Sequence, residues 1–292
     1  MPRWQADLIL GVITLIWGAT FVMVKNALGS VGPLTFVAWR FVAASLVLLA
    51  IFRRRMRTIT RAEALAGAVI GVWLWLGYTL QTVGLQFTTT GETAFITGLN
   101  VVLVPLLAAL LLRRTPTTAA VVGSLVATVG LGLLVLDESL RLQSGDLWVL
   151  GGMLGFTLHI VSISHFAIRF DTARLAVMQV GTVAGLALLA AFALETPTLA
   201  LPAPTWGAIG FTGVVATALV FSLQTHAQRF TTPAHTALIF SLEPVFGAFF
   251  GWWWAGELLG VKELAGCGLI LTGILLSEVA SGRRQEETVT AS

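Results

Sequence analysis

The stretch LQTVGLQFTT, residues Leu80–Thr89, recurs as LQTHAQRFTT at Leu223–Thr232. Six of the ten positions are identical, and the two copies lie 143 residues apart. The similarity continues at the same spacing, so that Thr93 matches Thr236 and Gly130 matches Gly273. Weak internal similarity of this kind marks a structural repeat. The sequence therefore predicts two copies of one unit, 1–143 and 144–280, followed by a tail at 281–292.

The composition indicates that both units lie in a membrane. Of the 292 residues, 57% are apolar and only 11% are charged, whereas about a quarter of the residues in a soluble domain are charged. A helix needs roughly 20 apolar residues to cross a bilayer core of about 30 Å. Ten stretches of this kind occur, at 6–24, 33–52, 62–86, 90–112, 119–136, 146–167, 175–194, 205–227, 233–254 and 262–280. We expect an all-α polytopic membrane protein with ten transmembrane helices and a polar, disordered cytoplasmic tail at 281–292.

The positions of the basic residues predict the orientation. If the N-terminus is cytoplasmic, most of the 17 Lys and Arg fall on the cytoplasmic side, as the positive-inside rule requires. These are Arg3, Arg53, Arg54, Arg55, Arg57, Arg61, Arg113, Arg114, Arg169, Arg174, Arg229, Arg283 and Arg284. Both termini are then inside, and the net charge of +3 gives no reason to expect a nucleic-acid partner. Because each unit has five helices, an odd number, the second unit enters the membrane inverted relative to the first.

At the end of the repeated stretch (Leu80–Thr89 and Leu223–Thr232), Thr and Glu residues predict two helix starts. Thr89 and Glu92 have the spacing of a capping box, in which each side chain bonds the backbone of the other. In the second copy, Thr232 precedes Pro233, a residue favoured at the first helical position. We therefore expect helices to begin near 90 and 233.

Polar residues at equivalent depths predict a central cavity. Asn100 and Glu243 are equivalent in the two copies and lie about ten residues into their helices, or about 15 Å along them, near the middle of the membrane. Polar side chains are costly in hydrocarbon and should face protein or a wet cavity. The polar residues that we expect to line this cavity on both walls are Tyr78, Gln81, Thr97, Asn100, Gln224 and Glu243.

Three further residues lie within the predicted spans, and Glu243 has more than one interpretation. Trp17 and His159 are expected to line the same cavity. Glu243 either binds a substrate ammonium or carries a proton, or else it is a structural carboxyl in the bend at Pro244. Arg40, the basic residue deepest in a span, either meets a substrate carboxylate or pairs within the protein.

Other polar residues have simpler interpretations. His165, His226 and His235 fall near the inner surface, where we expect them to be solvated. Helices 119–136 and 262–280 carry spaced glycines and are expected to pack closely, away from the cavity. The single cysteine, Cys267, excludes an intrachain disulfide and a thiolate metal site, and no ligand spacing accompanies His159. No metal or cofactor is therefore expected.

Four motifs carry a resemblance to a known family. They are WGATF at Trp17–Phe21, WRFVAA at Trp39–Ala44, LEPVFGAFFG at Leu242–Gly251 and GELLGVKELAGCGLILTG at Gly256–Gly273. With the repeat, they make the chain resemble the drug/metabolite transporter superfamily, specifically its EamA-type ten-helix exporters, and among these the YddG-type exporters of amino acids. One departure is that Arg113 and Arg114 stand where the second copy has Gly256 and Glu257.

The resemblance implies a secondary transporter in the bacterial inner membrane. Such a protein exports small metabolites, most of all amino acids, including aromatic or neutral ones, by alternating access through a central cavity. Its partners are a small-molecule substrate and the lipid bilayer, and it functions as a monomer.

The residues themselves also bear on other functions. An ATP-driven pump lacks support, because the chain has no phosphate-binding loop motif. An intramembrane enzyme needs a nucleophile with its base, or metal ligands, at one depth, whereas the residues at mid-depth are suited to binding. Phosphorylated sugars call for several basic residues in the pocket, and only Arg40 is available. Transport of drugs or phosphorylated sugars and an enzymatic role remain the alternatives.

Overall fold

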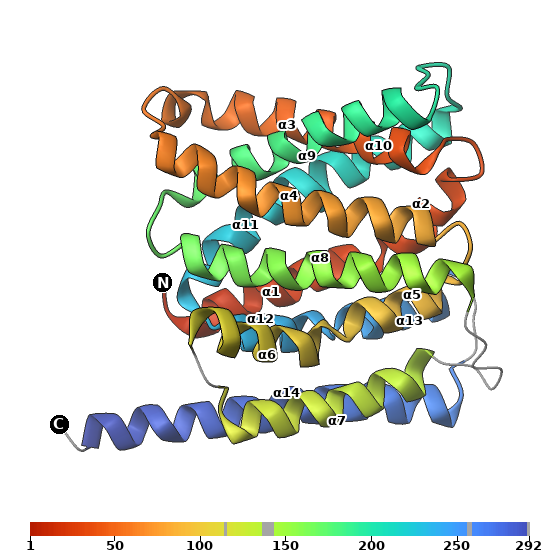
Figure 1. Ribbon diagram of the computed structural model, residues 1–292. Coiled ribbons are helices and arrows are strands. Elements are labelled where there is room, and N and C mark those ends of the chain that lie inside the picture. Colours follow the sequence, from red (N-terminus) through yellow and green to blue (C-terminus); the bar gives the residue numbers. More distant parts are fainter. Residues whose placement is uncertain (114–115, 136–142, 256–258, 291–292) are drawn as a thin grey trace.

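The computed structural model describes residues 1–113, 116–135, 143–255 and 259–290, and every regular element within them is a helix. The helices lie side by side in one bundle, and the described chain begins and ends at the same end of it (Figure 1). In chain order they are α1 Arg3–Gly18, α2 Thr20–Ala27, α3 Pro33–Met56, α4 Arg61–Gly84, α5 Thr90–Gly98, α6 Asn100–Leu112, α7 Thr118–Val135, α8 Ser144–Phe166, α9 Thr172–Leu194, α10 Ala203–Gly213, the π-helix η1 Val214–Leu219, α11 Val220–Ala227, the 3₁₀ turn η2 Gln228–Phe230, α12 Pro233–Phe240, α13 Glu243–Ala255 and α14 Val261–Thr290.

Each predicted apolar stretch lies mainly in helical backbone. In the described part of the chain, eight helices or helix runs are long and apolar enough to cross a membrane, from Arg3–Ala27 to Ala203–Phe230. The α12–α13 pair and α14 are outside this set, so their crossing of the membrane stays a prediction. The helical fold and the repeated spans are those of a multi-pass membrane protein.

The structure differs from the expectation at the C-terminal tail. α14 continues as helix through Thr290, whereas 281–292 were expected to be disordered. Arg, Gln and Glu dominate positions 283–287, and these residues have high intrinsic helix propensity. The polarity that ends the apolar span therefore does not end the helix. The last two positions lie outside the described residues.

The predicted helix starts in the repeated line are confirmed. The Thr89 hydroxyl accepts the backbone N–H of Glu92 at 3.0 Å, and the Glu92 carboxylate accepts the Thr89 N–H at 3.1 Å, so the capping box is complete. In the second copy, the Thr232 hydroxyl accepts the N–H of His235 at 3.2 Å, with Pro233 in the first turn. These caps fix where α5 and α12 begin, and hence the depth of every residue that follows.

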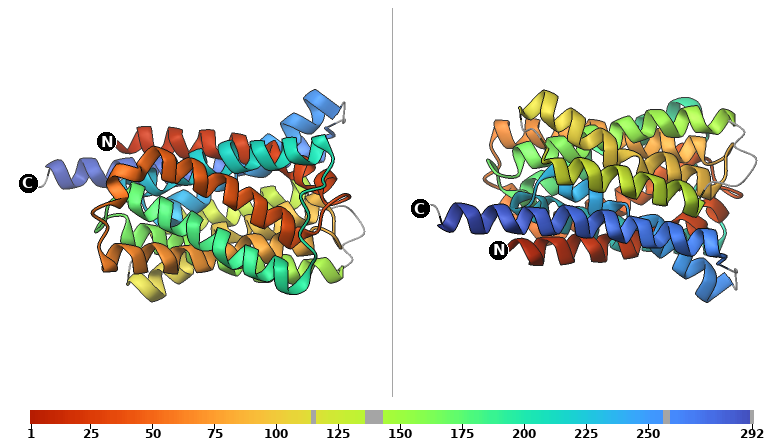
Figure 2. Two further views of the ribbon diagram at one scale, coloured as in Figure 1. Left: turned by 90° about the horizontal axis from the view of Figure 1, so that it is seen from above. Right: turned by 90° about the horizontal axis from the view of Figure 1, so that it is seen from below.

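The glycines of α7 and α14 bring these two helices into close contact. A Cβ built on Gly266 would lie 2.6 Å from the carbonyl oxygen of Gly130, and one built on Gly130 would lie 2.6 Å from that of Gly266. Gly123 and Gly273 oppose each other in the same reciprocal way. The pairing makes α7 and α14 antiparallel, and together they form one side of the bundle (Figures 1 and 2). Close packing through small residues is confirmed for this pair.

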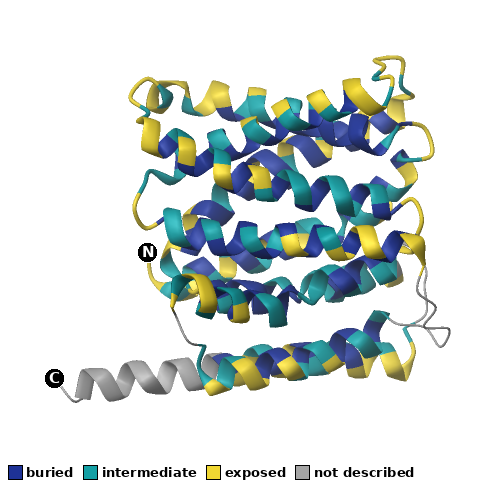
Figure 3. Cartoon of the chain, in the orientation of Figure 1, coloured by how far each residue is buried: buried dark blue, intermediate teal, exposed yellow. Residues whose placement is uncertain are grey.

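Contacts between the other helices follow the sequence repeat. α4 of the first copy packs along α8 of the second copy. Their equivalents in the opposite copies, α11 and α1, are also in contact. α3 and α9, which correspond to each other, pack together. Buried residues face these contacts, while many exposed residues lie on the outward sides of the helices and in the loops (Figure 3). The two copies are thus interleaved, and the space between them is enclosed by both.

Polar residues at the helix ends are fixed by neighbouring elements. The Glu195 carboxylate accepts the backbone N–H groups of Leu34 and Thr35 at 2.9 and 2.8 Å, at the positive end of α3. Lys25 donates to the carbonyls of Leu85 and Thr88, beyond the end of α4. The expectation that His235 is solvated is wrong, because α1 covers it. Its Nε2 lies 3.2 Å from the Asp7 carboxylate, and the residue is 4% exposed.

Candidate functional site

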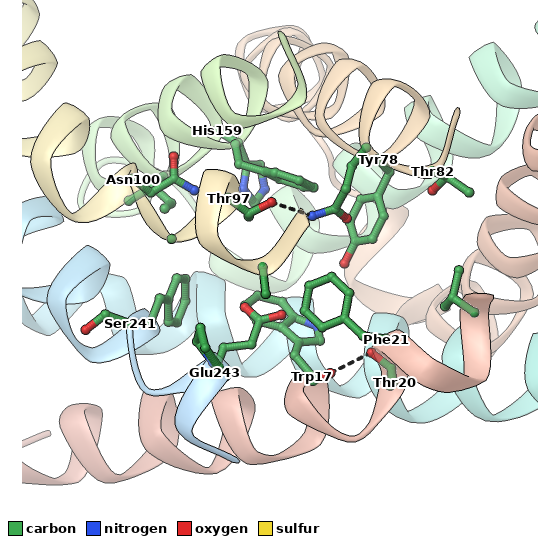
Figure 4. Close-up of a pocket in the computed structure, with 18 of the residues that line it drawn as sticks. Trp17, Thr20, Phe21, Tyr78, Thr82, Thr97, Asn100, His159, Ser241 and Glu243 are labelled. Atoms are coloured by element: carbon green, nitrogen blue, oxygen red, sulfur yellow. Dashed lines mark hydrogen bonds between the residues drawn. The ribbon is translucent and has the colours of Figure 1, made fainter. Parts of the chain in front are cut away.

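A cavity that is partly open to solvent lies in the centre of the bundle, bordered by α1–α6, α8 and α11–α13. The residues singled out from the sequence all line it: Trp17, Arg40, Tyr78, Gln81, Thr97, Asn100, His159, Gln224 and Glu243. Several of them point toward the same central space from different helices (Figure 4). The structure therefore brings the predicted set together around one cavity.

Three helix breaks shape the cavity. α1 gives way to α2 at Ala19, α5 to α6 at Leu99, and α12 to α13 at Ser241 and Leu242. Leu99 and Leu242 are equivalent positions in the repeat. Pro244 lacks the N–H that would continue α12 into α13, which accounts for the third break. Each break is flanked by lining residues, so the interrupted backbone itself borders the cavity.

Arg40 is held by three hydrogen bonds within the protein. Its Nε donates to the Thr217 hydroxyl at 2.8 Å, and its Nη2 donates to the Tyr78 hydroxyl at 3.2 Å and to the Ala216 carbonyl at 3.3 Å. The guanidinium carbon lies 4.5 Å from the centre of the Tyr78 ring. No hydrogen bond to the described chain uses Nη1, which leaves one face of the fork free for an anionic group.

Two of the three hydrogen-bond partners of Arg40 belong to a π-helix that the sequence did not predict. Ala216 and Thr217 lie in η1, Val214–Leu219, and the Ala216 carbonyl also accepts the Trp17 indole N–H at 3.1 Å. A π-turn shifts the register of backbone hydrogen bonds, and such turns are frequent at functional sites. Thr217 is the one polar side chain in this segment, and its apolar neighbours gave no indication in the sequence that it would bond Arg40.

Aromatic rings form one wall of the cavity. The Trp17 ring lies 5.9 Å from Phe221 and 5.1 Å from Phe240, and the Tyr78 ring lies 5.1 Å from Phe156. These are tilted or edge-to-face contacts, the arrangement that aromatic pairs prefer. Trp17 and Tyr78, which were expected in the cavity, line it together with Phe156, Phe221 and Phe240. Apolar rings within apolar spans give no sequence signal of their own.

Amides and hydroxyls also line the cavity, and their pairing differs between the copies. Gln81 donates from Nε2 to the Thr97 hydroxyl at 2.8 Å, and the Asn100 Oδ1 accepts a short hydrogen bond from the Thr157 hydroxyl. Gln224 is the equivalent of Gln81, but Phe240 stands where Thr97 would be required. The Gln224 Oε1 is buried and has no hydrogen-bond partner in the described chain.

Glu243 begins α13, and α1 closely approaches the backbone beside it. A Cβ on Gly18 would lie 2.9 Å from the Glu243 carbonyl oxygen, so only glycine allows this approach. The Glu243 side chain is partly accessible from the cavity. It attracts Arg40 electrostatically. Among the described residues that line the cavity, these two side chains carry opposite formal charges that cancel.

The fold and the cavity together define a class of protein. A bundle of long apolar helices that encloses a polar and aromatic cavity, with interrupted helices at its centre, is typical of a membrane transporter for small molecules. The chain matches the model of the EamA-like transporter family twice, at 4–136 and 143–278. It belongs to the EamA-like transporter family, and it is therefore a transporter and not an enzyme.

Individual relatives agree with this assignment. The chain is 34% identical to an uncharacterised transporter of Archaeoglobus fulgidus over 94% of this chain and 86% of that protein. It is 28% identical to the uncharacterised transporter YyaM of Bacillus subtilis over 90% of each chain. A solved crystal structure superposes with a TM-score of 0.81 at 18% identity, over 94% of this chain and 99% of its own. At that identity the likeness shows the fold alone.

Proposed function

We propose that this protein is a secondary transporter that exports amino acids, including aromatic and neutral ones, across the bacterial inner membrane by alternating access. The observation that carries the proposal is the cavity lining, which combines Arg40 and Glu243 with an aromatic wall. A zwitterion has no net charge, as the cavity has none, and it can present its carboxylate to the free Nη1 of Arg40. The rings of Trp17 and Phe221 suit an apolar side chain.

The cavity is less suited to phosphorylated sugars. Phosphorylated sugars carry one to two negative charges and bind where several Lys or Arg converge. Among the described lining residues, Arg40 is the only one of these, and Glu243 opposes it. A neutral or zwitterionic metabolite therefore fits best.

Uptake of labelled amino acids into proteoliposomes tests the proposal. We expect saturable uptake of one or more members of a panel of the twenty amino acids, measured with and without a pH gradient. Empty liposomes provide the background. Failure of every amino acid would contradict the proposed substrate class. Turnover of a candidate compound by the detergent-purified protein, without vesicles, would favour an intramembrane enzyme instead.

The proposed transport cycle places the two units in inverted orientation, with ten spans and both termini in the cytoplasm. The antiparallel packing of α7 against α14, which are equivalent in the repeat, supports this arrangement. A monomer suffices, because one chain encloses the cavity. The basic residues at one end of the bundle agree with the positive-inside rule.

The topology is tested by labelling single cysteines in a Cys267→Ala background. Arg57 and Thr196 are exposed and lie in the loops after α3 and α9. An impermeant thiol reagent added to intact cells should label Thr196→Cys and leave Arg57→Cys unlabelled until the membrane is opened. The reverse pattern would overturn the orientation.

Glu243 is proposed to carry the proton in pH-driven transport. The titratable groups that share the cavity with it are Arg40, Tyr78 and His159. A carboxyl that exchanges its proton as substrate binds can couple the two gradients, whereas exchange of substrate for substrate needs no proton. Glu243→Gln should therefore retain exchange at neutral pH, within about threefold of wild type, and lose accumulation driven by a pH gradient. Loss of all exchange in a well-folded variant would place the carboxylate in the substrate site.

A further inference from the structure

A chain of hydrogen bonds leads from a backbone carbonyl to the cavity through three helices. The Thr225 hydroxyl lies 2.6 Å from the Phe221 carbonyl oxygen on α11. The side-chain amide of Gln179, on α9, lies 2.8 Å from the Thr225 hydroxyl. The other end of that amide lies 2.9 Å from Nε2 of His159, on α8. Gln179 and Thr225 are fully buried and His159 is 2% exposed, so water does not compete for these bonds.

The direction of each bond in this chain is fixed by its first member. A carbonyl oxygen can only accept, so the single proton of the Thr225 hydroxyl is donated to Phe221. Thr225 must then accept from Gln179, which requires the NH₂ group of the amide to face it. The Gln179 oxygen consequently faces His159 and accepts from Nε2. The hydrogen-bond chain thus determines both the orientation of the amide and the protonated nitrogen of the imidazole.

The outcome is a defined tautomer of His159. With the proton on Nε2, Nδ1 of the neutral ring carries a lone pair and acts as an acceptor. No hydrogen bond to the described chain engages Nδ1, and this nitrogen is not among the buried unpaired atoms. Because His159 lines the cavity, its Nδ1 is available to a molecule inside it.

Gln224 adds a second unpaired acceptor. Gln224 lines the same cavity and is 1% exposed. Its Oε1 is buried without a hydrogen-bond partner in the described chain, so the side-chain amide must turn for this oxygen to meet a ligand in the cavity. Phe221 lies one helical turn before Gln224, and the Phe221 ring contacts the His159 ring edge-to-face at 5.6 Å. Phe221 thus contacts His159 and shares a helix with Gln224, and an aromatic ring itself attracts cations.

We propose that His159 Nδ1 and Gln224 Oε1 form a subsite that binds the ammonium group of the transported substrate, and that Gln179 is a positioning residue for it. The proposal rests on the proposed function. An ammonium has three N–H donors and no acceptor, so a pair of acceptors beside a ring complements it. Arg40, whose free Nη1 offers only donors, would take the opposite end of the zwitterion.

The tautomer is tested by NMR of protein labelled with ¹³C,¹⁵N-histidine. The chain has only four histidines, and the signal of His159 is identified by its loss in His159→Gln. We expect wild type to show Nδ1 unprotonated and Nε2 protonated. Thr225→Val removes the acceptor that orients Gln179 and should give a mixture of tautomers, whereas Thr225→Ser keeps the hydroxyl and should retain the wild-type signal. A protonated Nδ1 in neutral wild-type His159 would overturn the subsite.

The ligand is tested by transport of L-phenylalanine in proteoliposomes. Gln224→Leu and Thr225→Val should each raise the KM about tenfold, and Thr225→Ser should stay within twofold of wild type. Inhibition by 3-phenylpropanoate, which lacks the ammonium, should change less than twofold in all three variants. Equal losses for both compounds would show that the subsite does not recognise the ammonium. Absence of wild-type uptake of every amino acid would instead overturn the proposed function, and the ammonium assignment with it.

Discussion

Replacement of Arg40 by methionine is expected to reduce exchange of a zwitterionic amino acid by about 100-fold. Met is close to Arg in length and keeps the packing of its stem, but it removes the one formal positive charge among the described lining residues. The relevant charge pair is Arg40 with the substrate carboxylate. Loss of one partner from a buried, hydrogen-bonded charge pair costs about 2–5 kcal/mol, and about 2.7 kcal/mol corresponds to a 100-fold change. The measurement is exchange of labelled amino acid in proteoliposomes that contain equal amounts of folded protein.

A double variant separates the two roles that Arg40 can have. If it only balances the charge of Glu243, then Arg40→Met with Glu243→Gln should restore exchange, because the cavity is neutral again. If its Nη1 binds the substrate carboxylate, the double variant should remain at least tenfold impaired. We expect the second result. Recovery to the wild-type rate would remove Arg40 from the substrate site.

Gly266→Val is expected to destabilise the protein by about 3 kcal/mol, toward the upper end of the range for overpacked sites. A Cβ at this position would lie 2.6 Å from the Gly130 carbonyl oxygen and 2.7 Å from the Leu134 amide nitrogen. Both atoms belong to helical backbone and cannot move aside alone, so α7 and α14 must separate. Thermal unfolding in detergent should show a midpoint roughly 5–10 °C below wild type.

Gly268→Val is the matched control. It lies on the same helix two residues away, and a Cβ there meets nothing within 4 Å. The same substitution should change stability by less than about 0.5 kcal/mol, because valine and glycine differ little in helix propensity. Equal destabilisation by both substitutions would show that the α7–α14 contact is not the cause.

The sequence predicted the parts of the fold that rest on local chemistry. The starts of α5 and α12 followed from Thr89 and Thr232 because a cap is read within a few residues. The depth of Asn100 and Glu243 followed from those starts by helical rise, and both residues line the cavity. Gln81 and Gln224 were identified because a polar residue recurs at the same position of an apolar helix in both copies. Such a residue is costly facing lipid and is therefore expected in an enclosed polar site.

Contacts that depend on how helices meet were not predictable in this way. Gln179 is fully buried on α9 and has no counterpart in the repeated line, yet it links His159 to Thr225. The π-helix that offers the Ala216 carbonyl has the residues of an ordinary apolar helix. The burial of His235 depends on Asp7 of α1, more than 200 residues away in sequence. Each of these is set by tertiary packing, to which a single sequence gives no direct signal.

Counterflow tests whether a small zwitterionic metabolite crosses the membrane through this cavity. Proteoliposomes are loaded with unlabelled L-phenylalanine, diluted, and given a trace of labelled L-phenylalanine outside, without ATP or a pH gradient. A carrier with one alternating site should accumulate label transiently above equilibrium, and Arg40→Met should not. We expect wild type to show this overshoot for L-phenylalanine or another amino acid. Label that stays at the level of empty liposomes for every amino acid would contradict it.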